Sequence, residues 1–166
     1  VCRAKGTYFR KRMSMIPTQL ANPVQRRIRP VALCVFRSNN RILVSEGYDA
    51  QKQEKFYRPL GGGVEFGEYS WDAIRREIRE ELGEEIQNLT FIGPAENVFE
   101  YDGQPGHEII FVFEAEFVNP ALYRQEVIRG TEDDNTPIRA IWKPIADFKR
   151  NKAILYPDAL LDMLLG

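Results

Sequence analysis

Long apolar runs and clustered cysteines are both missing from this sequence. No apolar run approaches the roughly 18 residues that a membrane-spanning helix needs. Of the two cysteines, Cys2 lies in a polar segment and Cys34 in an apolar one, which excludes a disulfide framework and a cysteine-rich metal cluster. Few cysteines fit a reducing, cytoplasmic setting. Repeats and internal linkers are also absent after Val24, so the chain is predicted to form one domain around one core.

Acidic residues are absent from residues 1–30, although that segment is rich in arginine and lysine. The net charge of -1 therefore combines a basic leader with an acidic remainder. We expect residues 1–24 to form a flexible basic N-terminal extension and residues 25–166 to form the domain. A phosphate-attracting arm and a targeting peptide are the alternative interpretations of the leader.

The order of apolar and turn-forming segments predicts a mixed α/β domain. Apolar, partly β-branched runs predict strands over 31–36, 42–44, 56–60, 89–101, 109–117 and 138–142. Ser70 as N-cap and Gly83 as C-terminal signal predict a helix between them, and the leucines after residue 159 predict a closing helix. The alternation from Ile109 to Phe117 predicts a half-buried strand, whereas 119–137 is predicted to be irregular.

The helix predicted after Ser70 has two contrasting faces. At 100° per residue its apolar residues form one stripe, made of Trp71, Ile74, Ile78 and Leu82. Its carboxylates form the adjacent face, made of Glu77, Glu80, Glu81 and Glu84. Because like charges at this spacing repel, the acidic face needs compensation, and hard cations such as Mg²⁺ take oxygen ligands of this kind. Arg76 lies off the centre of the acidic face and is placed to pair with Glu68.

The segment from Gly62 to Glu84 resembles the Nudix box of the Nudix hydrolase family. Gly62, Glu68, Arg76-Glu77-Ile78, Glu80-Glu81 and Gly83 stand at the spacing of that motif. One position departs from it, because Glu84 occupies the place of an aliphatic residue. The resemblance extends, with weaker features, over about residues 29 to 165.

This resemblance implies a single-domain α/β/α sandwich with a mixed β-sheet. It implies hydrolysis of a pyrophosphate bond in a nucleoside diphosphate linked to another group X. Glu77, Glu80 and Glu81 would be catalytic and would bind Mg²⁺ or Mn²⁺, with the Gly61 carbonyl as a further metal ligand. Gly62, Glu68, Arg76 and Gly83 would have structural roles. Such chemistry needs no side-chain nucleophile, so the single histidine, His107, is interpreted as a turn or strand residue.

Substrate signals outside the motif are sparse. The proline that is typical of ADP-ribose hydrolases is missing from its expected position after the motif. Tyr101 stands where dinucleoside polyphosphate hydrolases carry a tyrosine, and Arg58 is a second candidate for substrate binding. Dinucleoside polyphosphates, NDP-sugars and NTP-like compounds all stay open as substrates. A further acidic residue would come from a group that the sequence does not rank: Glu100, Glu108, Glu114, Glu116, Glu132, Asp133 and Asp134.

Two other kinds of function stay open at this point. The domain could be a Nudix-fold regulatory module that senses a nucleotide without cleaving it, although the complete set Arg76, Glu77, Glu80 and Glu81 favours an enzyme. The acidic helix could also belong to an unrelated fold, as a solvated face. No membrane partner is expected, an RNA 5′ end stays open as substrate because of the basic leader, and a homodimer is compatible with the sequence.

Overall fold

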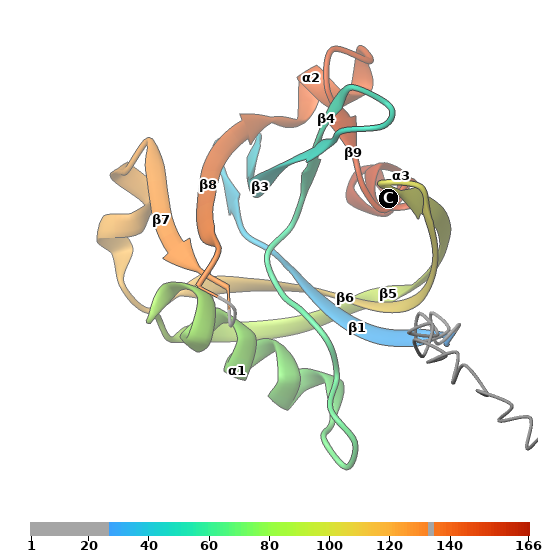
Figure 1. The fold of residues 1–166 in the computed structure, drawn as a ribbon. Helices are drawn as coiled ribbons and strands as arrows, with labels where there is room; N and C mark the ends of the chain where they lie inside the picture. Colours follow the sequence, from blue (N-terminus) through green and yellow to red (C-terminus); the bar gives the residue numbers. More distant parts are fainter. Residues whose placement is uncertain (1–26, 133–134) are drawn as a thin grey trace, which may run out of the picture.

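The computed structural model describes residues 27–132 and 135–166 (Figure 1). The predicted extension over residues 1–24 and the candidate ligands Asp133 and Asp134 lie outside this part of the chain. Within it, no helix is long and apolar enough to cross a membrane. The described chain forms two sheets with helices on either side of the first sheet, which confirms the predicted α/β sandwich.

The first sheet has three strands in the order β1-β6-β5. Strand β1 (Arg29–Val35) pairs in parallel with β6 (Gln104–Phe117), and β5 (Ile86–Tyr101) pairs with β6 antiparallel. The hairpin between β5 and β6 turns at Asp102 and Gly103, both of which have positive φ. Parallel and antiparallel pairing in one sheet confirms the mixed sheet.

The second sheet follows the order β7-β8-β3-β4-β9, with β2 paired to β3. Its strands are β2 (Arg37–Ser38), β3 (Arg41–Asp49), β4 (Glu54–Arg58), β7 (Val127–Thr131), β8 (Pro137–Pro144) and β9 (Ile154–Leu155). Strand β7 and the 3₁₀ helix η1 (Pro120–Arg124) fall in the segment that was predicted to be irregular. That prediction was wrong because β7 is short and its pattern contains Arg129 and Gly130, while pairing with β8 supplies its order.

Two apolar clusters lie on the two faces of β1 and β6. One cluster packs helix α1 (Ser70–Leu82) against Ala32, Cys34 and Phe113. The other packs helices α2 (Ile145–Lys149) and α3 (Leu160–Leu165) against Val31 and Ile110. Strand β6 is therefore buried on both faces at Ile110, Val112 and Phe113, and the prediction of a half-buried strand was wrong there. The odd-numbered residues do share one face, but Ile110 and Val112 on the other face are buried in the second cluster.

Helix α1 follows most of its sequence signals. Ile74 and Ile78 are fully buried, and Gly83 ends the helix in the left-handed conformation with φ of 70° while its N–H donates to the Arg79 carbonyl. Two details differ from expectation. The N-cap is Tyr69 rather than Ser70, and Trp71 is 49% exposed because its ring stacks on Tyr69 outside the core.

Candidate active site

A glycine loop and the outer face of α1 form the first half of the site. The loop lies along β1, where the Ala32 N–H donates to the Gly62 carbonyl and the Cys34 N–H donates to the Leu60 carbonyl, both at 2.9 Å. Gly61 has φ of 123°, and a Cβ there would lie 2.2 Å from the Ala32 carbonyl oxygen. Only glycine combines this backbone conformation with this close approach. The loop is thereby fixed against the sheet beside the glutamates of α1.

Arg76 ties the loop to the helix. Its guanidinium donates to both carboxylate oxygens of Glu68 at 3.0 Å, which is the pairing that the sequence predicted. It also donates to the Gly63 carbonyl at 3.0 Å and to the carboxylates of Glu77 and Glu80 at 3.0 and 2.7 Å. The Arg76 guanidinium beside Glu68 holds the pKa of that carboxyl below its usual range. Several charge-assisted hydrogen bonds at one guanidinium hold the loop and the helix rigidly together.

The three glutamates that the sequence singled out have different environments. Glu81 is buried, Glu77 is nearly buried, and Glu80 is exposed. A Cβ on Gly62 would lie within 2.6 Å of three atoms of the Glu77 carboxylate, so glycine makes room for that side chain. Glu84 does not share their face, as was predicted, because it follows the end of the helix and accepts from the Asn119 side chain at 3.1 Å. The left-handed turn at Gly83 explains this departure.

Glu81 is a strongly perturbed carboxyl. Burial, followed by the negative charges of Glu132 and Glu77, raises its pKa to about 8. Its Oε2 accepts a hydrogen bond from the Gly61 N–H at 3.2 Å, and this bond together with the charge of Arg58 opposes the rise. A buried carboxyl held near other carboxylates is a feature of functional sites, where a cation or a proton provides compensation.

The donor set suits a hard divalent cation. Carboxylate oxygens of Glu77, Glu80 and Glu81 face the loop side of α1, and oxygen ligands are those that Mg²⁺ and Mn²⁺ prefer. In the described part of the chain, no three His, Cys, Asp or Glu side chains already converge on one point. Arg76 pairs with two of the three glutamates, so a cation on Glu77 or Glu80 would compete with this guanidinium.

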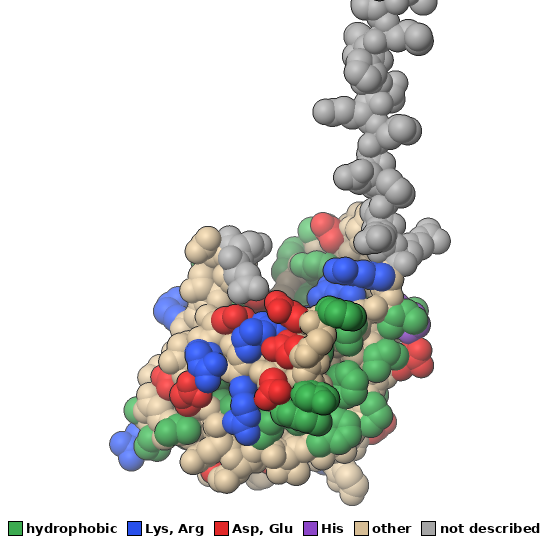
Figure 2. All heavy atoms as spheres, turned by 90° about the horizontal axis from the view of Figure 1, so that it is seen from below, with side chains coloured by type: hydrophobic (Ala, Val, Ile, Leu, Met, Phe, Trp, Pro, Cys, Tyr) green, Lys and Arg blue, Asp and Glu red, His purple; other side chains and the backbone are tan. Residues whose placement is uncertain are grey.

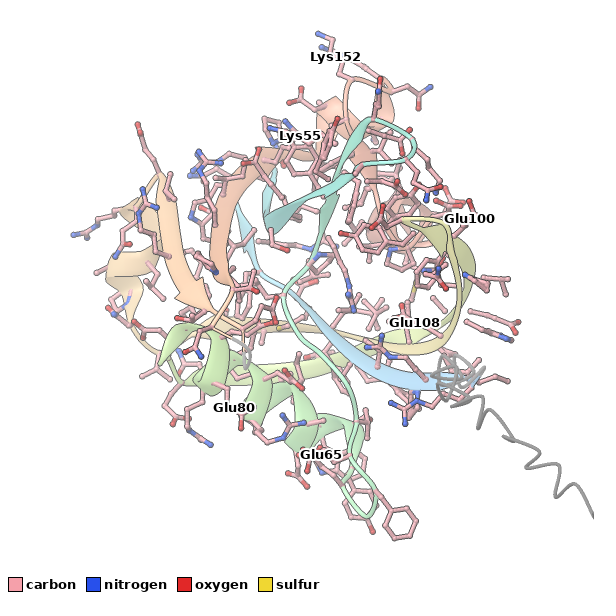
Figure 3. The ribbon with its side chains drawn as sticks, viewed as in Figure 1. Lys55, Glu65, Glu80, Glu100, Glu108 and Lys152 are labelled. Carbon is pink, nitrogen blue, oxygen red and sulfur yellow. The ribbon has the colours of Figure 1, made fainter. Side chains whose placement is uncertain are left out.

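Figure 2 looks onto the face of the molecule that carries α1. Acidic and basic side chains are intermixed there, next to an apolar area. The exposed aromatic side chains near the start of the helix are Phe66, Tyr69 and Trp71. Figure 3 places Glu80 on α1 and Glu65 on the adjoining loop, whereas Glu108 lies away from both on β6.

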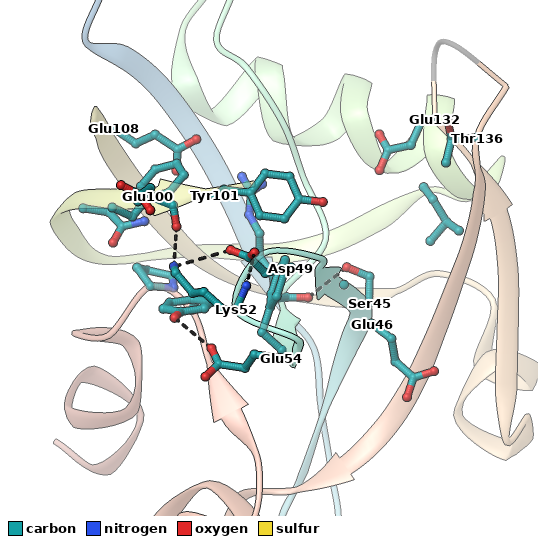
Figure 4. A pocket seen from close by; sticks show the side chains of 18 of the residues that line it. Ser45, Glu46, Asp49, Lys52, Glu54, Glu100, Tyr101, Glu108, Glu132 and Thr136 are labelled. Carbon is teal, nitrogen blue, oxygen red and sulfur yellow. Dashed lines mark hydrogen bonds and ion pairs between the residues drawn. The ribbon is translucent and has the colours of Figure 1, made fainter. Parts of the chain in front are cut away.

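A cavity of about 450 Å³ between the two sheets forms the second half of the site (Figure 4). Its walls come from β1, β3, β4, β5, β6 and β8 and from the segment that follows β7. Glu132 lines it at one side, and Glu108 lines it at the opposite side. Since Glu132 also raises the pKa of Glu81, the Glu132 side of the cavity is the one near the glutamates of α1.

Arg58 and Tyr101, the two predicted substrate-binding residues, both line this cavity. The Nη2 atom of Arg58 is buried and has no hydrogen-bond partner in the described residues. The Tyr101 hydroxyl donates to the Tyr48 carbonyl at 3.4 Å, and its ring packs edge-on against Phe56 with centroids 5.8 Å apart. A buried guanidinium nitrogen without an acceptor is costly unless a ligand supplies one.

The other acidic candidates are in different places. Glu114 pairs with Arg37 at 2.9 Å, and Glu116 accepts from Asn88 at 2.8 Å, so the structure does not bring them to the cavity. Glu100 and Glu108 line it together with Glu132. His107 lies 2.9 Å from Glu96 on the β5–β6 hairpin. This position agrees with its interpretation as a strand residue.

Several cavity residues gave no signal in the sequence. Asp49 is buried at the end of β3, where its carboxylate accepts from the backbone N–H groups of Gln51, Lys52 and Asp102. These hydrogen bonds hold its pKa below the usual range and join the β3–β4 turn to the hairpin. Asn97 on β5 also lines the cavity. Single polar residues at strand ends are common, and only the packing of the two sheets brings these together.

Comparison with known proteins agrees with this geometry. Residues 26–160 match the model of the NUDIX domain. Over 70 residues, the chain is 37% identical to the NAD-capped RNA hydrolase NudC of two Pseudomonas aeruginosa strains, LESB58 and PAO1. This match covers 42% of the chain and 23% of each relative, so the matched region spans about a quarter of the curated relatives.

Solved structures share the fold at low sequence identity. A NUDIX hydrolase from Nitrosomonas europaea superposes with a TM-score of 0.59 at 17% identity, over 84% of this chain and 87% of that one. A MutT NUDIX hydrolase from Burkholderia pseudomallei has a TM-score of 0.54 at 21% identity, over 73% and 86% of the two chains.

Proposed function

The chain belongs to the Nudix hydrolase family, and from this premise we propose that it hydrolyses a pyrophosphate bond in a nucleoside diphosphate linked to a group X. The observation that carries the proposal is the arrangement of Glu77, Glu80 and Glu81 on α1 beside a glycine loop, with Glu132 and Arg58 of the cavity near enough to Glu81 to affect its charge. Dinucleoside polyphosphates, NDP-sugars and NTP-like compounds are the substrate classes proposed. The likeness to NudC adds NAD and NAD-capped RNA to the compounds to be tested.

In the proposed mechanism, Glu77, Glu80 and Glu81 would hold the cation, with the Gly61 carbonyl as an additional ligand. Mg²⁺ or Mn²⁺ would neutralise the phosphoryl oxygens and activate the attacking water. One of these carboxylates would orient the attacking water toward phosphorus and accept its proton, while the bond from that phosphorus to the bridging oxygen breaks and the leaving phosphate keeps the electron pair. Glu132 is the proposed additional carboxylate, because it lines the cavity and is close enough to Glu81 to raise its pKa.

Arg58 and Tyr101 are proposed to bind the substrate. The buried Nη2 of Arg58 has hydrogen-bonding capacity for a phosphate oxygen, and the ring of Tyr101 provides an apolar contact. Gly62, Glu68, Arg76 and Gly83 are proposed to hold the loop and helix in place. A cytoplasmic location and a homodimer are compatible with this function but are not required by it.

A substrate panel tests the proposed function. Wild-type protein is incubated with Mg²⁺ or Mn²⁺ and with ADP-ribose, diadenosine tetraphosphate, NDP-sugars, NTPs, NAD or NAD-capped RNA, and the products are separated by chromatography. We expect metal-dependent cleavage of a pyrophosphate bond, and we expect Glu81→Gln to lower kcat at least 100-fold, which corresponds to about 3 kcal/mol.

Glu85→Gln is the matched control, because Glu85 is an exposed carboxylate that pairs with Arg79 just beyond the helix. Its activity should stay within twofold of wild type. Binding of a nucleotide without turnover by the wild-type protein would instead establish the regulatory-module alternative. Unchanged activity of Glu81→Gln would contradict the assignment of the site.

A further inference from the structure

Three polar side chains form a row across the floor of the cavity. Arg29 on β1 is the register partner of Glu108 on β6, and Glu108 is the register partner of Asn97 on β5. All three line the cavity. Neighbouring strands are about 4.8 Å apart, so the row presents a guanidinium, a carboxylate and an amide in sequence across the sheet.

Glu108 is the unusual member of this row. It is 4% exposed, yet the contact described for its carboxylate is an ion pair with Arg29 at 3.9 Å, which is longer than a hydrogen bond. The side chain of Arg29 is itself half exposed. Because Glu108 lines the cavity, a donor group of a ligand there can reach its carboxylate, whose hydrogen-bonding capacity an ion pair at 3.9 Å does not fill.

Aromatic side chains stand beside the row. The ring of Phe99 lies over Gly106, where a Cβ would be 2.3 Å from the ring, and the ring of Phe56 lies over Gly47 at the same separation. Tyr101 and Tyr156 pack edge-on against Phe56 with centroids 5.8 and 5.4 Å apart. This cavity therefore combines flat apolar surfaces with a carboxylate in its floor, on the side opposite Glu132 (Figure 4).

We propose that the row Arg29–Glu108–Asn97 recognises the base of the substrate, and that the base it favours is guanine. The proposal rests on the proposed function, since it assigns the nucleoside part of the same substrate. Guanine offers two adjacent donors, N1–H and the 2-amino group, which together match the two oxygens of one carboxylate. Its O6 is an acceptor, for which Asn97 and Arg29 supply donors on the two sides of Glu108.

Other groups fit the row less well. Uracil offers a single N–H between two carbonyl oxygens. These oxygens would repel the carboxylate, because both groups are hydrogen-bond acceptors. Adenine and cytosine each offer an amino group beside a ring nitrogen acceptor, so they supply one donor to Glu108 where guanine supplies two. Ribose hydroxyls also donate to carboxylates, but they do not need the amide and guanidinium that flank Glu108. These differences define the experiment.

Calorimetric titration of the full chain in Mg²⁺ with GMP, IMP, AMP, UMP and dGMP tests the proposal. Nucleoside monophosphates contain no pyrophosphate bond, so binding is measured without turnover. We expect GMP to bind at least tenfold more tightly than IMP, which lacks the 2-amino group, and more tightly than AMP or UMP. dGMP should bind like GMP. Equal affinity for the four ribonucleotides would overturn base recognition. Loss of dGMP binding alone would also overturn it, and would assign Glu108 to a ribose hydroxyl.

Variants locate the effect. Glu108→Gln should lower the affinity for GMP at least tenfold and change that for UMP less than twofold. Asn97→Ala, at a half-buried position, should lower GMP affinity severalfold. Glu100→Gln is the matched control, because Glu100 is an exposed carboxylate on the same cavity, and it should leave GMP binding unchanged. GMP binding that survives in Glu108→Gln with wild-type affinity would contradict the proposal.

The two levels of inference fail differently. If the substrate panel shows hydrolysis but guanine compounds have no advantage, the base assignment is wrong and the proposed hydrolysis stands. If GMP binds selectively and no pyrophosphate is cleaved, the base assignment stands and the proposed hydrolysis is wrong.

Discussion

At the scale of single residues, Glu81 has an unusual environment for a carboxyl. Its carboxyl is buried, accepts one backbone hydrogen bond, and lies near the charges of Glu77 and Glu132, and its pKa rises to about 8. Arg76 and Glu68, by contrast, form an ion pair at 3.0 Å, and we propose that it holds the loop against the helix. Burial and neighbouring negative charge raise the pKa of Glu81, whereas the guanidinium of Arg76 lowers the pKa of Glu68.

The raised pKa predicts a dependence of stability on pH. Because the pKa of Glu81 is higher in the folded state than in the unfolded chain, this carboxyl contributes stability that is fully present below about pH 4.5 and is lost as the pH rises through about 8. In chelator, the free energy of unfolding should fall by about 1 to 3 kcal/mol between pH 6 and pH 9. Urea denaturation at several pH values measures it.

Glu81→Gln is the informative variant for this dependence. A neutral amide cannot lose a proton, so its free energy of unfolding should change little over the same pH window, and at pH 9 it should exceed that of the wild type. Carboxyls whose pKa is lowered, such as Glu68 and Glu85, titrate below this window. An equal decline in both proteins would show that Glu81 is not the titrating group.

At the scale of elements, the approach of β7 to α1 brings Glu132 to the site. A Cβ on Gly130 would lie 2.1 Å from the Glu81 carbonyl oxygen and 2.8 Å from Leu82. Strand and helix therefore touch through backbone at the C-terminal end of α1. Glu132 follows two residues later, next to the end of the strand.

Gly130→Ala should separate these two elements. We expect a loss of about 1 to 3 kcal/mol in the free energy of unfolding, because backbone atoms cannot move aside without shifting the helix or the strand. Hydrolytic activity should fall as well, since Glu81 and Glu132 would move apart. Denaturation and initial rates measure the two effects.

Gly63→Ala is the control for this substitution. Gly63 has no atom within 4 Å of a built Cβ and does not have positive φ, so alanine should change stability by less than about 0.5 kcal/mol. Wild-type stability of Gly130→Ala would show that the contact between β7 and α1 is looser than described.

At the scale of the whole molecule, the sequence predicted what depends on local pattern. The C-terminal end of α1 at Gly83, the burial of Ile74 and Ile78, and the pairing of Arg76 with Glu68 follow from spacing along the chain. The position of Glu84, the exposure of Trp71 and the strand β7 depend on chain turns and neighbours, and local pattern did not reveal them. The cavity could not be predicted for the same reason, because residues from several strands line it and only the packing of those strands brings them together.

The central claim is that hydrolysis depends on a divalent cation held by the glutamates of α1. The most direct measurement is the initial rate of pyrophosphate cleavage as a function of free Mg²⁺, for wild type, Glu81→Gln and Glu85→Gln. We expect saturable Mg²⁺ dependence in wild type and in Glu85→Gln, and a rate at least 100-fold lower in Glu81→Gln at every Mg²⁺ concentration. A wild-type rate that persists in chelator, or a Glu81→Gln curve that overlies the wild-type curve, would contradict the claim.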